Sequence, residues 1–425
     1  MKFGTDGIRG IFQTELKTNH AYSIGYAIGK MAKEFLGEGS GKIVVGRDTR
    51  KSGQELQKAL VAGISEGGST SYLLGVVPTP AVQFYSKKFA YGVMITASHN
   101  GAEYNGIKVF ASNGKKLTET EEQKIEECLG KLKKHICIQK ESFRQKRPTE
   151  YIYSRKQNLV PITKRIAIDC ANGAASRIAK KIFEGQNIVW LHCNPNGKNI
   201  NKNCGSTKLG SLKEAVVKNK CDIGFAFDGD ADRCLAVDEK GNEITGDNIL
   251  YILANSMKRK GRLLGGVVAT EFSTLSLKEA LLRCGIEYEQ TIVGDKYVKQ
   301  KMEEKNWNLG GERSGHIIIS DKAETGDGIL TAIELICVLE QSGGKASALS
   351  KGFSSLFRYE INIKQNNGLV KKAINIASEL NKTLSLERIV IRKSGTENLI
   401  RIMCESGSAR RAKMFATYFQ SLLQI

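Results

Sequence analysis

The stretch VMITASHNGAEYNGIKVF, Val93–Phe110, guides our interpretation of the whole chain. It begins within the apolar run Tyr91–Ile95, which predicts a short buried strand. That strand ends at small polar residues followed by an Asn-Gly turn signal. A serine delivered by a strand onto a tight turn, as Ser98 is here, can expose its hydroxyl while the scaffold fixes its direction. A second strand starting near Gly106 is predicted to bring Lys108 close to the same serine.

The composition is typical of a globular protein. With 425 residues, 41% of them hydrophobic and 25% charged, the chain is long enough for about two to four domains. No apolar run approaches the roughly 18 residues needed to span a bilayer, and Met1–Gly4 leads straight into glycine-rich sequence, so we expect neither a membrane segment nor a signal peptide. The ten cysteines contain no Cys-x-x-Cys pair, so we expect reduced thiols in a cytoplasmic protein, without disulfides or a zinc site.

The chain carries an excess of positive charge. Lysine and arginine number 64 against 44 acidic residues, which gives a net charge of +20. Such a balance is compatible with nucleic-acid binding, but the basic residues are spread along the chain and no nucleic-acid-binding motif is present. A positive field also concentrates a small anionic substrate in a cleft. We therefore expect a small-molecule partner and no nucleic acid.

Alternating strand and helix signals predict an α/β fold in several units. We expect three α/β domains at 1–150, 151–246 and 247–352, followed by a smaller α+β C-terminal domain at 353–425. The polar, basic segment 143–164 contains two prolines and is predicted to be a connector between the first two domains.

An acidic cluster follows the predicted strand Ile223–Phe227. Its three carboxylates, Asp228, Asp230 and Asp232, alternate along the chain and can converge on one hard cation through oxygen. A calcium-binding EF-hand is excluded because Arg233 stands where that loop needs glycine, and because a strand precedes the loop. The pattern predicts a Mg²⁺ site, since magnesium favours carboxylates together with a phosphate oxygen.

Three further loops carry polar groups suited to a phosphorylated sugar. In the glycine-framed loop 309–316, the side chains suited to sugar hydroxyls are Glu312, Arg313, Ser314 and His316. In the loop 389–398, the groups suited to a phosphate are Arg392, Ser394, Gly395 and Thr396, with Arg401 in the following strand. The loop 3–10 offers Arg9 as an oxyanion ligand. This inventory indicates phosphoryl transfer on a phosphorylated sugar.

The chain resembles the α-D-phosphohexomutase family from end to end. The segments that carry the resemblance are FGTDGIRG (3–10), GRDTRKSG (46–53), TASHN (96–100), DCANGAA (169–175), DGDADR (228–233), VGDKYV (293–298), GGERSGH (310–316) and KSGTE (393–397). The resemblance implies four domains around a central cleft, one Mg²⁺ per active site and often a homodimer.

The resemblance also implies roles for individual residues. Ser98 is expected to be carried as phosphoserine, with Asp228, Asp230, Asp232 and a phosphoseryl oxygen holding Mg²⁺. Lys108 and Arg9 are candidates for general base and acid, and Arg233 is expected to steady the transferring phosphoryl group. His99 is a further catalytic candidate, although it cannot be assumed to be the base. The residues expected to bind the sugar are Glu312, Ser314 and His316. Those expected to bind the phosphate that is not reacting are Arg392, Ser394, Gly395 and Thr396.

Within the family the loops most resemble members that act on glucosamine phosphate. The implied isomerase would interconvert glucosamine 6-phosphate and glucosamine 1-phosphate through a 1,6-bisphosphate, which also acts as activator, toward UDP-N-acetylglucosamine and cell-wall precursors. Arg313 stands where such members usually have glutamine, which leaves a glucose or mannose phosphate preference open. A catalytically silent phosphosugar sensor is a third reading, opposed by the intact Ser98, Lys108 and aspartates.

Overall fold

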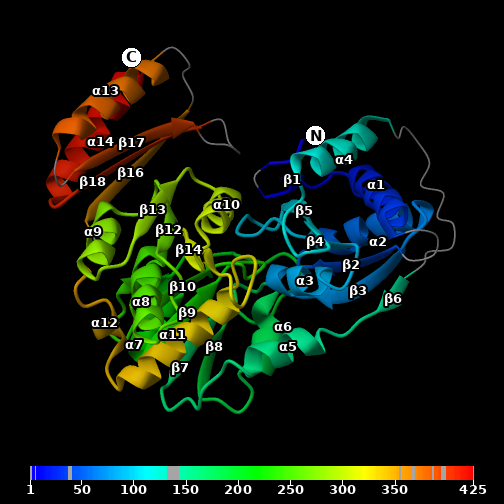
Figure 1. The fold of residues 1–425 in the computed structure, drawn as a ribbon, viewed down its shortest axis with the longest axis horizontal. Helices are drawn as coiled ribbons and strands as arrows, with labels where there is room; N and C mark the ends of the chain where they lie inside the picture. The colour runs from blue at the N-terminus through cyan, green and yellow to red at the C-terminus, as the bar shows by residue number, and fades with distance from the viewer. Residues whose placement is uncertain are drawn as a thin grey trace.

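The computed structural model describes residues 2–4, 6–36, 41–131, 143–353, 356–364, 369–384, 387–393 and 399–424. Within these residues, the strands form four separate sheets that follow one another along the chain (Figure 1). The three N-terminal sheets contain parallel pairs and are accompanied by helices, whereas the fourth is purely antiparallel. This arrangement confirms the predicted α/β architecture with a smaller C-terminal unit.

The first sheet positions the serine loop. Its strand order is β1-β5-β4-β2-β3-β6, and its strands are β1 (Ile8–Ile11), β2 (Lys42–Arg47), β3 (Thr70–Val76), β4 (Tyr91–Ile95), β5 (Tyr104–Ala111) and β6 (Phe143–Gln145). The accompanying helices are α1 (Thr18–Leu36), α2 (Ser52–Glu66), α3 (Thr79–Ser86) and α4 (Glu119–Lys131). All five residues of β4 are buried, as the uninterrupted apolar run predicts. β4 and β5 pair antiparallel, so the loop between them begins and ends at one edge of the sheet.

The second and third sheets place the next two loops. The second has the order β11-β10-β9-β7-β8, with strands β7 (Ile166–Asp169), β8 (Ile188–Leu191), β9 (Ile223–Phe227), β10 (Cys234–Asp238) and β11 (Glu243–Ile244) and helices α6 (Ala175–Ile182) and α7 (Gly210–Lys218). The third has the order β13-β12-β14-β15, with strands β12 (Val267–Thr270), β13 (Tyr288–Thr291), β14 (Leu309–Gly311) and β15 (Ile317–Ile319). Its helices are α8 (Gly246–Arg259), α9 (Leu275–Arg283), α10 (Asp295–Lys305), α11 (Gly328–Ser342) and α12 (Ala346–Leu349).

A continuous hydrophobic core joins the first three units. It includes Val82 near the first sheet, Phe225 in the second and Leu309 in the third. Helix α11 is buried from Gly328 to Leu339 and contributes much of this core. Interiors of this kind are close-packed, so the loops of the three units are held at fixed relative positions.

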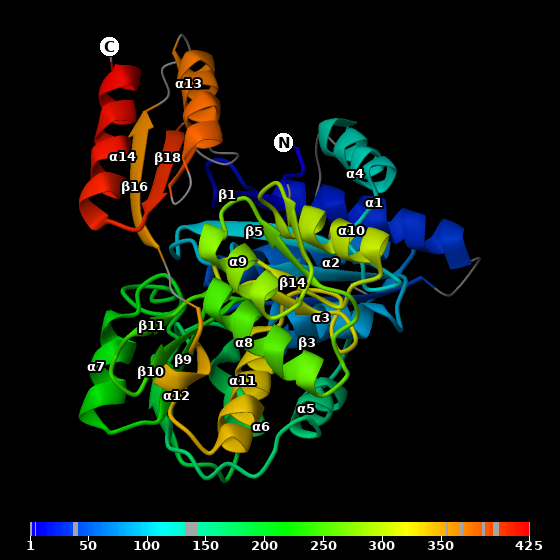
Figure 2. The same ribbon diagram turned by 60° about the vertical axis from the view of Figure 1, so that its left-hand side comes forward.

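The C-terminal unit has its own core and stands at one end of the molecule. Strands β16 (Phe357–Lys364), β18 (Leu399–Ser406) and β17 (Arg388–Lys393) form its sheet in that order, accompanied by α13 (Val370–Thr383) and α14 (Ala409–Gln424). Figures 1 and 2 both show this unit beside the end of the third unit where α9 begins. Arg388 donates to the carbonyl of Ser273 there, and Glu405 accepts from the amide of Leu275 at 3.3 Å.

The segment 143–164 is more than the connector that its polar sequence indicates. It contributes strand β6, which pairs with β3, and helix α5 (Thr149–Lys156). Two side chains of α5, Tyr151 and Arg155, are buried and bind Asp327 at 2.9 Å and 2.8 Å. The prediction of a simple connector was wrong here, because Asp327 at the start of α11 binds Tyr151 and Arg155 and so allows both polar side chains to be buried. None of the helices described is long and apolar enough to cross a membrane.

Candidate active site

Ser98 lies on the tight loop between β4 and β5. Its side chain is buried, and its backbone adopts φ of 50°, a left-handed conformation that is uncommon for residues other than glycine. The Ser98 amide donates to Thr96 Oγ1 at 2.9 Å, and Thr96 donates in turn to Asp48 at 2.7 Å. A strained residue of this kind persists only where its surroundings hold it. The loop therefore fixes the direction of the Ser98 hydroxyl.

Arg50 is the residue that holds this loop, and the sequence alone did not reveal it. Its guanidinium is fully buried and pairs with Asp48 at 2.8 Å. It donates to loop carbonyls at Ser98 (3.0 Å) and Asn100 (2.8 Å), and also to those of Gly101 and Tyr104. In the sequence, Arg50 stands out only as part of GRDTRKSG, one of the segments that resemble the family, and the residue types of this segment do not indicate a role for it.

Arg50→Lys is expected to destabilise the protein and to slow turnover. A lysine ammonium cannot reproduce the planar fork that reaches several carbonyls at once, and it leaves buried acceptors unsatisfied. We expect a loss of about 3 kcal/mol in the free energy of unfolding, measured by denaturant titration, together with a lower kcat. The neighbouring exposed Lys51→Gln is the control and should change neither. A wild-type kcat in Arg50→Lys would contradict this role.

The three predicted metal ligands lie close together beside Ser98. Asp228, Asp230 and Asp232 follow β9, are buried, and each bring a carboxylate oxygen within 4.8 Å of the others. Ser98 Oγ donates to Asp228 at 2.6 Å. Burial and the charges of the other two carboxylates raise the pKa of Asp228 well above its usual value. The predicted meeting of the serine with the acidic cluster is therefore present in the structure.

The residues present fit a hard divalent cation. The Oδ1 atoms of Asp230 and Asp232 are buried and accept no hydrogen bond from the described residues. Buried carboxylate oxygens without partners are costly, and a cation offsets both the missing contacts and the mutual repulsion. An all-oxygen donor set beside a serine that could carry a phosphate is the kind that Mg²⁺ prefers. The acidic triad can therefore bind a metal ion.

Lys108 is buried against the same carboxylates. Its Nζ lies 2.8 Å from Asp232, 2.9 Å from Asp230 and 2.8 Å from Asp6. Burial alone would lower the pKa of Lys108, but the charges of these carboxylates outweigh burial and raise it well above its ordinary value. In this structure Lys108 is thus held as an ammonium ion. It can serve as a base only when the carboxylates are engaged elsewhere.

The other catalytic candidates surround the serine. His99 Nδ1 lies 3.3 Å from Ser98 Oγ, and the charge of Arg233, burial and the charge of Arg9 lower its pKa to about 3. His99 is therefore neutral and a weak base at neutral pH. Burial disfavours the charged Arg233, but the charges of Asp232 and other carboxylates outweigh burial and raise its pKa. Arg9 pairs with Asp6 at 2.5 Å.

The sugar-type loop reaches the same place from the third unit. Ser314 donates to Glu312 at 3.1 Å, and Glu312 also accepts from the amide of Gly294. His316 is buried, with Nδ1 3.8 Å from Asp232. Burial lowers the pKa of His316, but the neighbouring carboxylate of Asp232, helped by that of Asp295, raises it to about 9. The Gly326 amide, 3.1 Å from Nε2, favours the neutral ring instead, so two influences oppose each other at this histidine.

Arg313 stands where related loops usually have glutamine, and its side chain binds a residue outside the sugar loop. Its guanidinium pairs with Asp247 at 3.0 Å, in the first turn of α8. Asp247 is fully buried and also accepts from the Thr274 amide at 2.9 Å. The arginine therefore neutralises a buried carboxylate of the scaffold.

The phosphate-type loop is described only at its start. Arg392 stacks on the ring of Phe272 at 4.5 Å and lies opposite Arg401 in the pairing of β17 with β18. Burial and the neighbouring charge of Arg401 lower the pKa of Arg392, although the charges of Glu271 and Glu312 oppose this. The two arginines therefore place two positive charges side by side on this sheet. The predicted residues Ser394, Gly395 and Thr396 lie outside the described residues.

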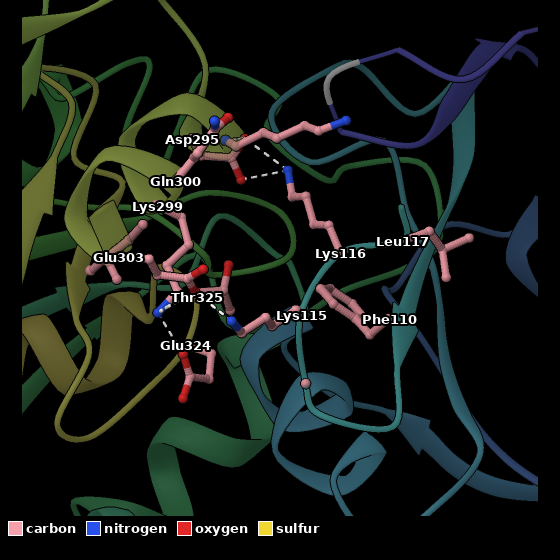
Figure 3. A pocket seen from close by; sticks show the side chains of 13 residues that line it. Phe110, Lys115, Lys116, Leu117, Asp295, Lys299, Gln300, Glu303, Glu324 and Thr325 are labelled. Atoms are coloured by element: carbon pink, nitrogen blue, oxygen red, sulfur yellow. Dashed lines mark hydrogen bonds and ion pairs between the residues drawn. The ribbon is translucent and has the colours of Figure 1, made fainter. Parts of the chain in front are cut away.

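A cavity of about 160 Å³ lies between the first and third units (Figure 3). It is bordered by the segment that follows β5 and by α10. Figure 3 shows Lys116 reaching across it to Asp295, with an oxygen 2.6 Å away. Lys116 also contacts Asp6 at 3.0 Å, and Asp295 lies 3.6 Å from His316. A chain of charges therefore connects Lys108 in the first unit, through Asp6, with His316 in the third.

Comparison with known proteins agrees with this geometry. Four family models match in chain order, namely phosphoglucomutase/phosphomannomutase alpha/beta/alpha domains I (1–135), II (147–241) and III (245–356) and the C-terminal domain (360–420). A phosphoglucosamine mutase from Caldicellulosiruptor saccharolyticus is 42% identical, covering 99% of this chain and 98% of the relative. Another, from Shouchella clausii, is 39% identical, covering 97% and 96%.

Solved structures show the same fold. The crystal structure of a phosphoglucomutase/phosphomannomutase family protein from Burkholderia thailandensis superposes with a TM-score of 0.82 at 24% identity, over 99% of this chain and 96% of that one. Taken together with the sequence relatives, which match nearly the full length, the chain belongs to the phosphoglucomutase/phosphomannomutase family, also called the α-D-phosphohexomutases.

Proposed function

We propose that this chain is a phosphoglucosamine mutase that interconverts glucosamine 6-phosphate and glucosamine 1-phosphate. The observation that carries the proposal is the hydrogen bond from Ser98 Oγ to Asp228, within a buried carboxylate triad and beside Lys108. The choice of sugar rests on the two relatives above, which are named phosphoglucosamine mutases. The route toward UDP-N-acetylglucosamine and cell-wall precursors follows from the product.

The reaction proceeds in two transfers through phosphorylated Ser98. The free 1-hydroxyl of glucosamine 6-phosphate attacks the phosphorus, the Oγ–P bond breaks, and the hydroxyl proton passes to a basic group. The resulting 1,6-bisphosphate then rotates within the site, so that its 6-phosphate reaches Ser98. Ser98 Oγ then attacks the phosphorus of the 6-phosphate, the O6–P bond breaks, the proton is returned to O6 of the sugar, and glucosamine 1-phosphate leaves. A trace of bisphosphate acts as activator because it phosphorylates any unmodified Ser98.

Charged side chains stabilise the transfer. The guanidinium groups of Arg9 and Arg233 suit the anionic oxygens of the phosphoryl group better than proton transfer. Lys108 is the closer candidate for exchanging the proton, because it lies in the network that contains Asp230 and Asp232. His99 contacts Ser98 Oγ as a neutral ring and helps to orient it.

Asp228, Asp230, Asp232 and a phosphoseryl oxygen would hold one Mg²⁺. The cation supplies positive charge that lets a phosphoserine lie beside three carboxylates. Lys108 offsets part of the charge of these aspartates, and Ser98 and Thr79 donate hydrogen bonds to Asp228 and to Asp230 (2.5 Å).

The sugar binds in two orientations, so the contacts must work in both. Glu312, Ser314 and His316 offer acceptors and donors to its hydroxyl groups. Arg392, with Ser394, Gly395 and Thr396, grips the phosphate that is not reacting. The structural support for this phosphate contact is Arg392, which lies beside Arg401. The roles of the other three residues are predictions from the sequence.

Arg313→Gln is expected to leave the sugar preference nearly unchanged. The arginine pairs with buried Asp247, so its loss affects the scaffold more than the sugar. The ratio of kcat/KM for glucosamine and glucose phosphates should move by less than about tenfold, or about 1.4 kcal/mol. Glu312→Gln, inside the sugar loop, is the matched comparison and should lower kcat/KM for both substrates. A larger shift in Arg313→Gln would make that arginine a specificity residue.

The function is tested by assaying purified protein with Mg²⁺ and a trace of 1,6-bisphosphate. Glucosamine 6-phosphate, glucose 1-phosphate and mannose 1-phosphate are compared as substrates. Preference for glucosamine phosphate supports the proposal, whereas preference for glucose or mannose phosphate would assign a phosphoglucomutase/phosphomannomutase. Binding of phosphosugars without turnover would indicate a silent sensor.

Four expectations from the sequence stay predictions. They are the domain limits at 150, 246 and 352, a possible homodimer, a cytoplasmic location and the absence of nucleic-acid partners. Sedimentation analysis of the full chain measures the oligomeric state directly.

A further inference from the structure

Three metal-binding side chains of different chemistry meet in the second unit. Asp169 is the last residue of β7, and His192 directly follows β8. These parallel strands are neighbours, with Asp169 opposite Leu191, so both side chains emerge at the same sheet edge. Cys204 reaches the same point from the loop before α7. One ligand atom from each lies within 4.8 Å of the other two, and His192 Nδ1 is 3.0 Å from Asp169 Oδ2.

The surroundings prepare this group for a ligand. Asp169 and Cys204 are fully buried, whereas the His192 side chain is 29% exposed and gives a path from solvent. Asp169 is oriented by the amides of Ala171 (2.8 Å) and Gly205 (3.0 Å), as metal-binding carboxylates usually are. His192 Nδ1 is buried and makes no hydrogen bond of acceptable geometry with the described residues, in spite of its distance from Asp169.

We propose that Asp169, His192 and Cys204 form a binding site for a divalent transition metal ion of the Zn²⁺ type, separate from the carboxylate triad. One oxygen, one imidazole nitrogen and one sulfur suit Zn²⁺ and leave a fourth position for water. An all-oxygen triad suits Mg²⁺ instead, so the two sites differ in the ions they select. On binding, the Cys204 S–H bond breaks, a metal–sulfur bond forms, and the proton passes to solvent without any change in oxidation state.

The proposed site is tied to the serine loop. Asn201 lies between them, because its amide donates to Ala171 at 2.9 Å and its side chain donates to the carbonyls of Ser98 (2.8 Å) and Asn100 (2.9 Å). Ser206, after Cys204, donates to the carbonyl of Phe227 at the end of β9, directly before the acidic cluster. Metal binding by Asp169, His192 and Cys204 would therefore stabilise both the loop that carries Ser98 and the start of the acidic cluster.

Cobalt is the probe that distinguishes this site from the triad. Co²⁺ is titrated into the full-length protein in the presence of excess Mg²⁺, and thiolate-to-cobalt absorption is recorded in the near ultraviolet. The wild type should give this absorption, and Zn²⁺ should abolish it by competition. Cys204→Ser should lack it, while His192→Ala should weaken cobalt binding by more than about tenfold. Cys193→Ser is the matched control beside His192 and should retain it.

A second measurement separates metal binding from loss of fold. Zn²⁺ should raise the thermal midpoint of the wild type and of Cys193→Ser but not that of Cys204→Ser, while the circular dichroism of all three stays the same. The proposal is overturned if the wild type gives no thiolate absorption, or if Cys204→Ser keeps it. A Cys204→Ser variant that is folded and still stabilised by Zn²⁺ would also overturn it. None of these outcomes depends on mutase turnover.

Discussion

Ser98→Ala is expected to abolish mutase turnover. In the proposed mechanism this hydroxyl accepts and returns the phosphoryl group, so its loss removes the nucleophile. We expect kcat to fall by on the order of 10⁴-fold or more, measured by coupled assay at saturating glucosamine 6-phosphate and Mg²⁺. The fold should persist, because the loop is held through backbone contacts to Arg50 and Asn201 that do not involve the hydroxyl.

Ser86→Ala is the matched control for this experiment. Ser86 is also a buried serine, and its hydroxyl donates only to the Gln83 carbonyl within α3. Its replacement should leave kcat near the wild-type value. If Ser98→Ala retained more than a few per cent of wild-type turnover, phosphorylation of Ser98 would not be the route of transfer.

Lys108→Met is expected to impair both stability and catalysis. Without the ammonium, the buried carboxylates of Asp230 and Asp232 and the partly exposed carboxylate of Asp6 remain together without the cation that they share. Removing one partner of a buried charge network costs about 3–5 kcal/mol, so the free energy of unfolding measured in EDTA should fall by about that amount. Added Mg²⁺ should restore part of it, because the cation replaces the lost positive charge. Turnover should fall by about 10²-fold or more even with Mg²⁺ present.

Lys115→Met provides the comparison. Lys115 is largely exposed and pairs with Glu303 at 3.0 Å, so its loss should change stability by less than about 1 kcal/mol. Equal stability of Lys108→Met and wild type in EDTA would contradict the role of Lys108 as the cation that balances Asp230 and Asp232.

The sequence predicted those features of the site that follow directly from strand ends. Ser98 and the Asp228 cluster each come after a short apolar run, and such runs are buried strands that deliver the residues following them to the edge of their own sheet. Arg50 was missed because its partners are mainly backbone carbonyls of distant residues, which leave no pattern in side-chain identity. Its burial became visible only in three dimensions.

Two other differences have the same cause. Tyr151 and Arg155 lie in a stretch that is polar in sequence, yet Asp327 satisfies them from the start of α11. Arg313 looked like a sugar contact because of its neighbours in the loop, but buried Asp247 binds it. In each case a long-range ion pair decides the burial of a charged side chain, and the spacing of residues along the chain contains no record of that pair.

Direct passage of the phosphoryl group from Ser98 to the sugar can be followed in a single turnover. Protein phosphorylated at Ser98 is mixed with an excess of glucosamine 6-phosphate and Mg²⁺ for a single turnover, and protein and sugars are analysed by mass spectrometry. We expect the loss of phosphate from Ser98 to be matched by the appearance of glucosamine 1,6-bisphosphate, followed by glucosamine 1-phosphate. Retention of phosphate on Ser98 while glucosamine 1-phosphate accumulates, or its release as inorganic phosphate without bisphosphate, would contradict the account.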